Sequence, residues 1–238
     1  MTFSVSINVF LVIIGFLPSL IWLSIFLTKD PRPEPKYLII KVFLFGVIIA
    51  PVVVMLEAII SGVSRNGFIS SAALFFTLAA FIEEYMKYWV VKVSVVSKPD
   101  FDEPHDSIIY MITAALGFAA MENILIAFKI YPEGFAATLG IISLRFIGAT
   151  LLHALSSGIV GYFLGLAWFF YHFKKQIVAF GLVLASLAHL TFNYMIFLNP
   201  SAAMPGNTLL LLGMMILLLV LFDRLKERHK QLIHSVST

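Results

Sequence analysis

Six ionisable side chains lie inside long apolar stretches of this sequence, where a charge is costly. They are Glu83, Glu84, Lys87, Glu122, His153 and His189. On insertion scales each charge at bilayer depth costs on the order of 3 kcal/mol. A fold that places so many of them there is expected to use them, so they predict a buried functional site.

The spacing of these residues predicts that they converge. Glu83 and Lys87 are four residues apart and therefore share one helix face, as do His189 and Asn193. A carboxylate beside a second carboxylate in a low-dielectric site suits water activation, and the adjacent acids Glu83 and Glu84 can divide the roles of base and acid. Neutral imidazoles can bind a metal or stabilise an oxyanion, so a zinc site with glutamate and histidine ligands is an alternative.

Long apolar segments must position these residues. Of the 238 residues, 61% are hydrophobic and 12% are charged, whereas a soluble domain is about 45–50% apolar and about 25% charged. The composition predicts an all-α polytopic membrane helix bundle with about seven transmembrane spans. The predicted spans are 5–27, 37–60, 68–91, 107–128, 149–171, 177–197 and 206–223. The shorter stretch 135–147, which contains Arg145, is interpreted as an interfacial or re-entrant helix.

Basic residues indicate the orientation, because cytoplasmic loops are enriched in Lys and Arg. Most of the basic residues fall on one side of the predicted spans. They are Lys29, Arg32, Lys36, Lys41, Lys92, Lys98, Lys174, Lys175, Arg224, Lys226, Arg228 and Lys230. Arg65 and Lys129 fall on the other side. We therefore expect the N-terminus outside and the C-terminus in the cytoplasm. The first span lacks a basic N-terminal region and a small-residue cleavage site, so it is not interpreted as a signal peptide.

The sequence excludes several chemistries. It has no cysteine, which removes thiolate nucleophiles and thiolate metal sites. The aspartates all lie in loops or the tail, which excludes an aspartyl intramembrane protease; they are Asp30, Asp100, Asp102, Asp106 and Asp223. Neither H-E-x-x-H nor G-x-S-x-G occurs. The net charge of +3 does not suggest nucleic-acid binding.

Four other residues have structural interpretations. Glu57, near the end of its span, is expected to reach toward the membrane surface. Asp106 is expected to be the N-cap of the fourth span. Gly161 and Gly165 form G-x-x-x-G, which predicts close helix packing.

Several short motifs occur in order along nearly the whole chain. Glu83–Lys87 reads E-E-x-x-K, and Phe118–Asn123 reads F-x-x-x-E-N. Arg145 precedes one histidine motif at His153, and His189 with Asn193 forms a second. Acidic loops before the second and fourth spans complete the pattern, at 29–35 and 101–106. With these motifs the chain resembles the PrsW-type intramembrane proteases, distant relatives of the type II CAAX prenyl proteases.

The resemblance implies a membrane-embedded endopeptidase that cuts membrane-anchored proteins, in a group associated with regulated proteolysis of proteins such as anti-sigma factors. By their place in the motifs, the expected catalytic residues are Glu83, Glu84, Glu122, His153 and His189. The supporting residues are Lys87, Asn123, Arg145 and Asn193. If a metal is bound, with zinc as the candidate, its expected ligands are Glu122, His153 and His189.

The resemblance also implies a single integral-membrane protease domain over residues 1–238, in a bacterial or archaeal plasma membrane. Its expected partners are the lipid bilayer and a membrane-anchored protein substrate, with no nucleic acid. A proton-coupled transporter is the alternative, because Glu, Lys and His chains also form proton relays. Internal repeats and broken helices, which are typical of transporters, are not seen in the sequence.

Overall fold

The computed structural model describes residues 2–65, 72–200 and 203–237, and these ranges contain eight α-helices, three short 3-10 turns and no strand. The helices are α1 (Thr2–Leu27), α2 (Lys36–Arg65), α3 (Ala72–Ser94), α4 (Asp106–Ile130), α5 (Phe135–Ile147), α6 (Ala149–Leu166), α7 (Lys174–Leu198) and α8 (Ala203–Ser237). The all-α prediction is confirmed, and each predicted span corresponds to one helix. The first residues of the predicted span 68–91 lie outside the described residues.

Within the described ranges, six segments are long and apolar enough to cross a membrane, by length and composition. They are Ser6–Leu27, Lys36–Gly62, Asp106–Glu133, Phe135–Phe169, Tyr171–Leu198 and Ala203–Ser235. The predicted span on α3 is not among them, because its central charges lower its hydropathy. Those charged side chains are buried against other helices rather than exposed. The protein is therefore an integral membrane protein in which the charged face of α3 is turned into the bundle.

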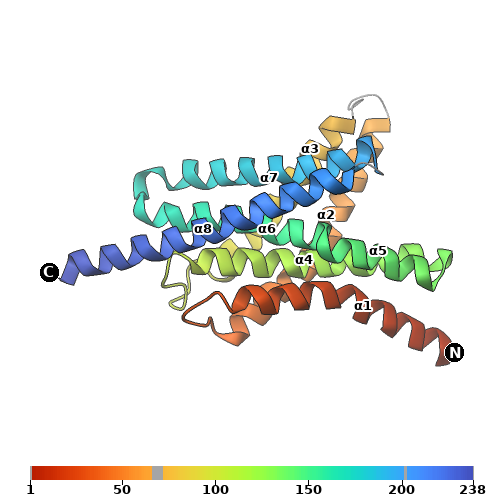
Figure 1. Ribbon diagram of the computed structural model, residues 1–238, viewed down its shortest axis with the longest axis horizontal. Coiled ribbons are helices and arrows are strands. Elements are labelled where there is room, and N and C mark those ends of the chain that lie inside the picture. Colours follow the sequence, from red (N-terminus) through yellow and green to blue (C-terminus); the bar gives the residue numbers. More distant parts are fainter. Residues whose placement is uncertain (1, 66–71, 201–202, 238) are drawn as a thin grey trace.

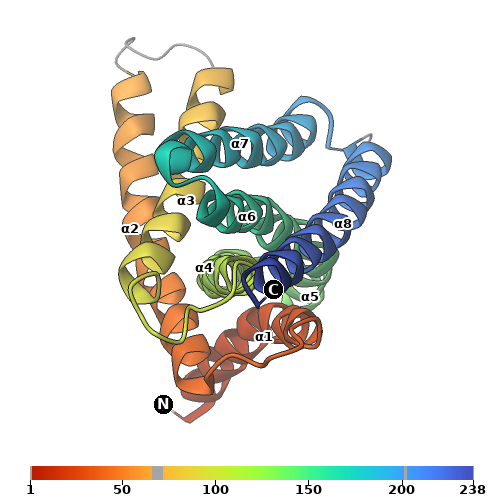
Figure 2. The same cartoon turned by 90° about the vertical axis from the view of Figure 1, so that its left-hand side faces the viewer.

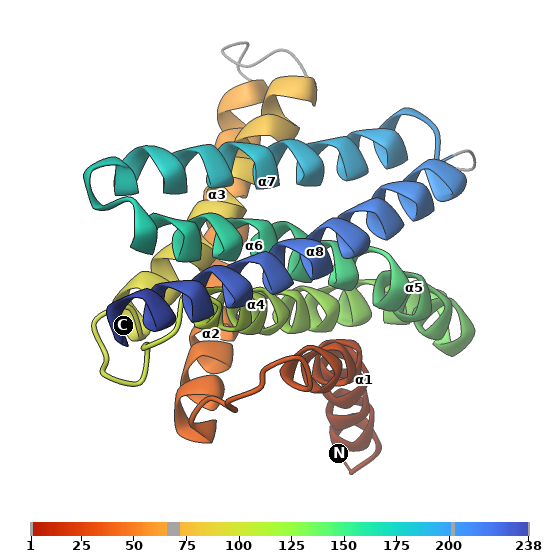
Figure 3. The same cartoon turned by 60° about the vertical axis from the view of Figure 1, so that its left-hand side comes forward.

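Helix α4 is the centre of the bundle. Most of its side chains are buried, and it packs along α1, α2 and α6. Figure 2 shows α4 end-on, with α1, α2, α6 and α8 around it. In Figure 1 the long axes of α4, α6, α7 and α8 run in one general direction, and in Figure 3 α2 and α3 cross that direction steeply. The crossing brings the middle of α3 against α4, α6 and α7.

Local sequence determines where the helices begin and end. Three prolines at 31, 33 and 35 interrupt the helical pattern after α1. The backbone N–H groups of Leu38 and Ile39, in the first turn of α2, donate to the Pro35 carbonyl. Gly134 has φ +115°, a conformation that side chains disfavour, and it separates α5 from the turn after α4. Gly148 divides the apolar segment 135–169 into α5 and α6. A separate 13-residue helix at Phe135–Ile147 matches the predicted short helix.

Two predictions about helix ends differ from the structure. Helix α8 continues past the predicted end at 223 to Ser237, because the charged tail keeps a helical pattern. Asp106 is not an N-cap: α4 begins at Asp106 itself, and His105 precedes it without a side-chain cap. The Oδ2 atom of Asp106 instead accepts hydrogen bonds from the backbone N–H groups of Asp102 and Glu103. It therefore holds the α3–α4 loop.

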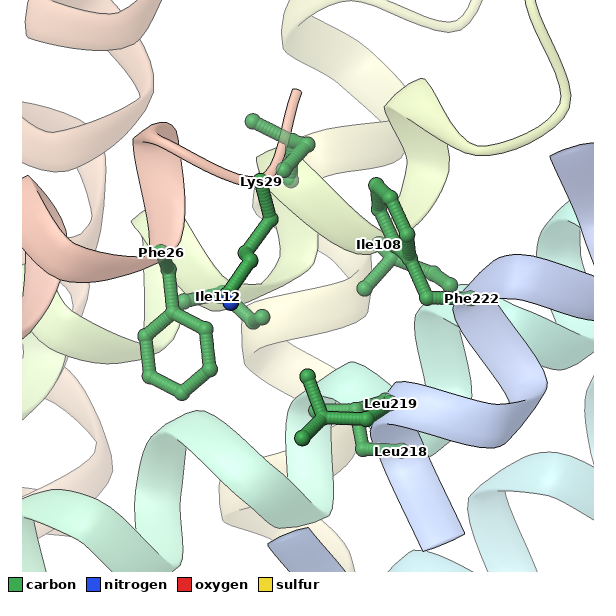
Figure 4. Close-up of a pocket in the computed structure, with 8 residues that line it drawn as sticks. Phe26, Lys29, Ile108, Ile112, Leu218, Leu219 and Phe222 are labelled. Carbon is green, nitrogen blue, oxygen red and sulfur yellow. The ribbon is translucent and has the colours of Figure 1, made fainter. Parts of the chain in front are cut away.

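A small cavity of about 20 Å³ lies between α1, α4 and α8 (Figure 4). Its lining is apolar, with Phe26, Ile112 and Phe222 among the residues, and in this view Lys29 extends toward Ile112. This volume holds about one water molecule. The cavity is therefore a packing feature and too small for a peptide.

Glycines let the central helices approach closely. A Cβ atom on Gly117 of α4 would clash with the backbone carbonyl oxygen of Phe43 on α2. A Cβ on Gly161 of α6 would lie 2.6 Å from the Cα of Ile108 on α4. The close packing predicted for the G-x-x-x-G motif is therefore confirmed.

The contact at Gly117 gives a testable prediction. Gly117→Ala is expected to lower the free energy of unfolding by about 1–3 kcal/mol, because α2 and α4 must separate to admit the methyl group. Gly213→Ala on α8 is the matched control, since its Cβ would meet nothing within 4 Å. Denaturant unfolding of both variants in detergent checks this; equal stability of the two variants would contradict it.

Candidate active site

The predicted site residues come together in the interior of the bundle, where α3 meets α4, α6 and α7. Glu84 and Lys87 have no exposed surface, and Glu83, His153 and His189 are each at most 5% exposed. Glu122 and Arg145 lie at the edge, with about a fifth of their side-chain surface exposed. The cluster is thus almost fully buried, and the part of it that solvent can reach lies at Glu122 and Arg145.

Glu84 is held by four side-chain donors. Its Oε1 atom lies 2.8 Å from Lys87 Nζ and 3.0 Å from His189 Nδ1. The hydroxyl of Ser156 lies 2.9 Å from the same oxygen, and the hydroxyl of Ser157 lies 2.7 Å from Oε2. A carboxylate with this many donors is fully engaged. Glu84 therefore acts as a fixed anion that orients its neighbours.

Lys87 links Glu84 to the first histidine. Its ammonium also lies 2.8 Å from Nδ1 of His153 and 4.7 Å from the ring centre of Phe118. An ammonium group has donors and no acceptor, so His153 Nδ1 must accept from it. The proton of this neutral imidazole is then on Nε2, which lies 2.7 Å from Oε2 of Glu122. These contacts assign the tautomer of His153 from its partners.

Glu122 and Arg145 form the outer part of the site. The guanidinium of Arg145 donates to Glu122 Oε2 at 3.1 Å and to Asn123 Oδ1 at 2.6 Å. Asn123 in turn donates to Thr150 Oγ1 at 3.0 Å. The network connects the short helix α5 to α4 and α6. It gives Arg145 a defined position beside the buried residues.

Glu83 is the less engaged carboxylate, with one long hydrogen bond from Lys87 among the contacts already described. Its Oε2 atom lies 3.5 Å from Lys87 Nζ, 3.6 Å from His153 Nδ1 and 3.8 Å from His189 Nε2. Since His189 donates through Nδ1 to Glu84, its Nε2 presents a lone pair toward Glu83. Two acceptors, Glu83 Oε2 and His189 Nε2, therefore face each other across a gap of 3.8 Å, an arrangement that favours a proton donor or a cation between them.

The donor set fits a metal in type and spacing. One ligand atom each from Glu83, His153 and His189 lies within 4.8 Å of the other two, and two histidines with a glutamate are a known catalytic zinc set. Glu122 contacts Nε2, the other ring nitrogen of His153. In metal sites a carboxylate often accepts a hydrogen bond from the ring nitrogen of a histidine that does not bind the metal. Lys87 is the competitor, because its ammonium occupies the His153 lone pair that a metal would need.

Some site residues are placed otherwise than the sequence indicated. Asn193 is half-buried one turn after His189, and among the described contacts it makes no hydrogen bond to the cluster. Glu57, expected to reach toward the membrane surface, contacts the carboxyl group of Glu83 instead. Sequence reasoning also missed Ser156 and Ser157 as partners of Glu84. The available signal was their spacing, three and four residues after His153.

Comparison with known proteins identifies one family. The PrsW family of intramembrane metalloproteases matches residues 34–221. The chain is 31% identical to Protease PrsW of Oceanobacillus iheyensis over 223 residues, which cover 92% of this chain and 96% of the relative. It is 34% identical to Protease PrsW of Geobacillus kaustophilus over 65% of each chain. The relative from Bacillus subtilis, also named Protease PrsW, is 29% identical over 76% of this chain and 80% of its own length.

No solved structure matches the chain. The family match extends over most of the sequence and includes every residue of the buried cluster. The relatives are named as proteases, and the described helices are those of an integral membrane protein. The chain is therefore a membrane-embedded peptidase and belongs to the PrsW family of intramembrane metalloproteases.

Proposed function

We propose that this peptidase hydrolyses peptide bonds of membrane-anchored proteins with a water molecule activated by Glu83. The observation that supports this most directly is the difference between the two adjacent acids. Glu84 is engaged by four donors, whereas Glu83 accepts one long hydrogen bond, from Lys87, and faces His189 Nε2 across the gap of 3.8 Å. A water molecule in that gap can donate one proton to Glu83 and the other to His189 Nε2. It is then oriented for attack while Glu83 acts as its base.

The neighbouring residues complete the proposed reaction. Glu57 contacts Glu83, and a carboxyl pair in contact can share the proton that Glu83 removes from water. Glu122 and Arg145 lie where the site is accessible, so they would bind the substrate backbone next to the scissile bond. The amide of Asn193, on the same face of α7 as His189, would donate to the developing oxyanion.

A bound metal belongs to the same gap. Glu83, His153 and His189 would hold it, with zinc as our candidate, and it would supply a Lewis acid that lowers the pKa of the water. Lys87 would have to release His153 Nδ1 when the metal enters. With the metal bound, Glu83 would serve as a ligand instead of the base, and Glu84 would still keep His189 in the same tautomer.

The substrate is a protein held in the bilayer, such as a single-pass regulator of the anti-sigma-factor type. The position of the site supports this proposal, because its buried residues lie on long apolar helices that can span a membrane, where a protein held in the same bilayer can approach them. We further propose that residues 1–238 act as one catalytic domain. The transporter alternative is not favoured by the family match.

Substitution of Glu83 tests the proposed reaction. Glu83→Gln keeps the size of the side chain and removes its basicity, so cleavage of a single-pass model substrate by the purified protein is expected to fall by about 10²–10⁴-fold. Glu133→Gln, an exposed glutamate before α5, is the matched control and should cleave as wild type does. A Glu83→Gln variant that cleaves at the wild-type rate refutes the proposed role. Wild-type protein that never cleaves but moves protons across liposomes would support the transporter instead.

Lys87 gives a second prediction, on stability. Lys87→Met leaves the carboxylate of Glu84 buried without its cation, which is expected to lower the free energy of unfolding by about 3–5 kcal/mol. Lys92→Met on the same helix is the control, since Lys92 is exposed and its loss should change stability by less than about 1 kcal/mol. Urea unfolding in detergent measures both. Similar stability of the two variants would mean that Lys87 does not compensate Glu84.

A further inference from the structure

A second cluster of titratable side chains lies far from the proposed active site, at the end of the bundle that the basic residues predict to be cytoplasmic. Glu103, His105 and Asp106 each offer a ligand atom, and these atoms lie within 4.8 Å of one another. Asp106 is 16 residues before Glu122 on α4, or about 24 Å along the helix. The cluster is therefore separate from the residues that act on the substrate.

The three side chains are buried. Asp106 has no exposed surface, His105 is 3% exposed and Glu103 is 7% exposed. Buried polar groups are normally hydrogen-bonded, and an unpaired one is unfavourable. Both ring nitrogens of His105 and Oδ1 of Asp106 nevertheless lack a hydrogen-bond partner among the described residues, although Nε2 of His105 lies 3.2 Å from Oε2 of Glu103. These atoms point to a ligand that the protein itself does not supply.

The surroundings strengthen this conclusion. Nine buried side-chain atoms lack a partner in the described residues, and five of them belong to this region. Besides the three on His105 and Asp106, they are Oδ2 of Asp30 and Nδ1 of His229. Asp30 lies in the α1–α2 loop and His229 on α8, where its Nε2 is 4.0 Å from Oε1 of Glu103. Three separate segments thus contribute unsatisfied atoms to one place.

The charge balance favours a cation. Four carboxyl groups meet here, from Asp30, Glu34, Glu103 and Asp106. The basic groups beside them are Arg32, which lies 3.0 Å from Glu103, and Lys226. The ring of His105 lies among these carboxyl groups, and an imidazole nitrogen can supply a lone pair to a cation.

From this geometry we propose that Glu103, His105 and Asp106 bind a divalent first-row transition-metal ion, of the Zn²⁺ or Mn²⁺ type. One imidazole with two carboxylates suits such an ion better than Mg²⁺ or Ca²⁺, which prefer oxygen ligands alone. Asp30 and His229 are the candidates for a further ligand. The ion would tie the α3–α4 loop to the α1–α2 loop and to α8, and its role is structural. This site does not depend on whether the active site binds a metal.

Metal uptake by the full-length protein tests the proposal. Purified protein in detergent is stripped with a chelator and titrated with Mn²⁺, with the free ion followed by electron paramagnetic resonance. Zn²⁺ is added in a parallel thermal-unfolding measurement. His105→Gln is expected to bind one equivalent of Mn²⁺ fewer than wild type and to lose the stabilisation that Zn²⁺ gives to this end of the bundle. His172→Asn, an exposed histidine in the α6–α7 turn, is the matched control and should bind as wild type does.

The difference of one equivalent identifies the site whatever the active site holds, since His105→Gln leaves Glu83, His153 and His189 unchanged. The ring of His105 makes no hydrogen bond among the described residues, and the bonds to its backbone carbonyl remain in His105→Gln, so this variant is expected to fold. Glu103→Gln is the second variant and should lose the same equivalent. The proposal is overturned if either folded variant binds as many equivalents as wild type. Stripped wild-type protein that takes up neither ion also overturns it.

Discussion

The contact of the buried Lys87 ammonium with Glu84 and His153 is the interaction on which the rest of the site depends. Taking an ion pair out of water is offset only when its remaining polar atoms are also bonded. Glu84 meets this condition through three further donors on α6 and α7. Because Lys87 only donates and Glu84 only accepts, the pair also determines which nitrogen of each histidine has the proton. Glu83 is then the carboxylate left facing the gap.

The fold allows that contact inside a membrane by covering it. The charged face of α3 is too polar to face lipid, and α4, α6 and α7 cover it. The close approach at Gly117 and Gly161 allows α4 to lie against α2 and α6 at once. This places Glu122 behind His153, where a carboxylate can orient the ring from its other nitrogen. The loops at the far end, including Asp106, hold the start of α4.

Much of this arrangement could be predicted from the sequence, because apolar length identifies spans and a charge inside a span is rarely idle. The clustering of Glu83, Glu84, Glu122 and the two histidines followed from that reasoning and from the motifs. The spacing of residues along the sequence does not predict how one helix is rotated against another. Glu57 was assigned to the membrane surface because it lies near a helix end, yet the crossing of α2 and α3 turns it toward Glu83. The partners of Glu84 on α6 likewise depend on packing between distant segments.

The central claim, that Lys87 and Glu84 fix the protons of both histidines, is tested most directly by ¹⁵N nuclear magnetic resonance of histidine-labelled protein in lipid. The ring-nitrogen shifts distinguish the two neutral tautomers from the charged form, and His153→Asn and His189→Asn assign the signals. The account predicts a neutral His153 with its proton on Nε2 and a neutral His189 with its proton on Nδ1. A proton on Nδ1 of His153, or on Nε2 of His189, would contradict it.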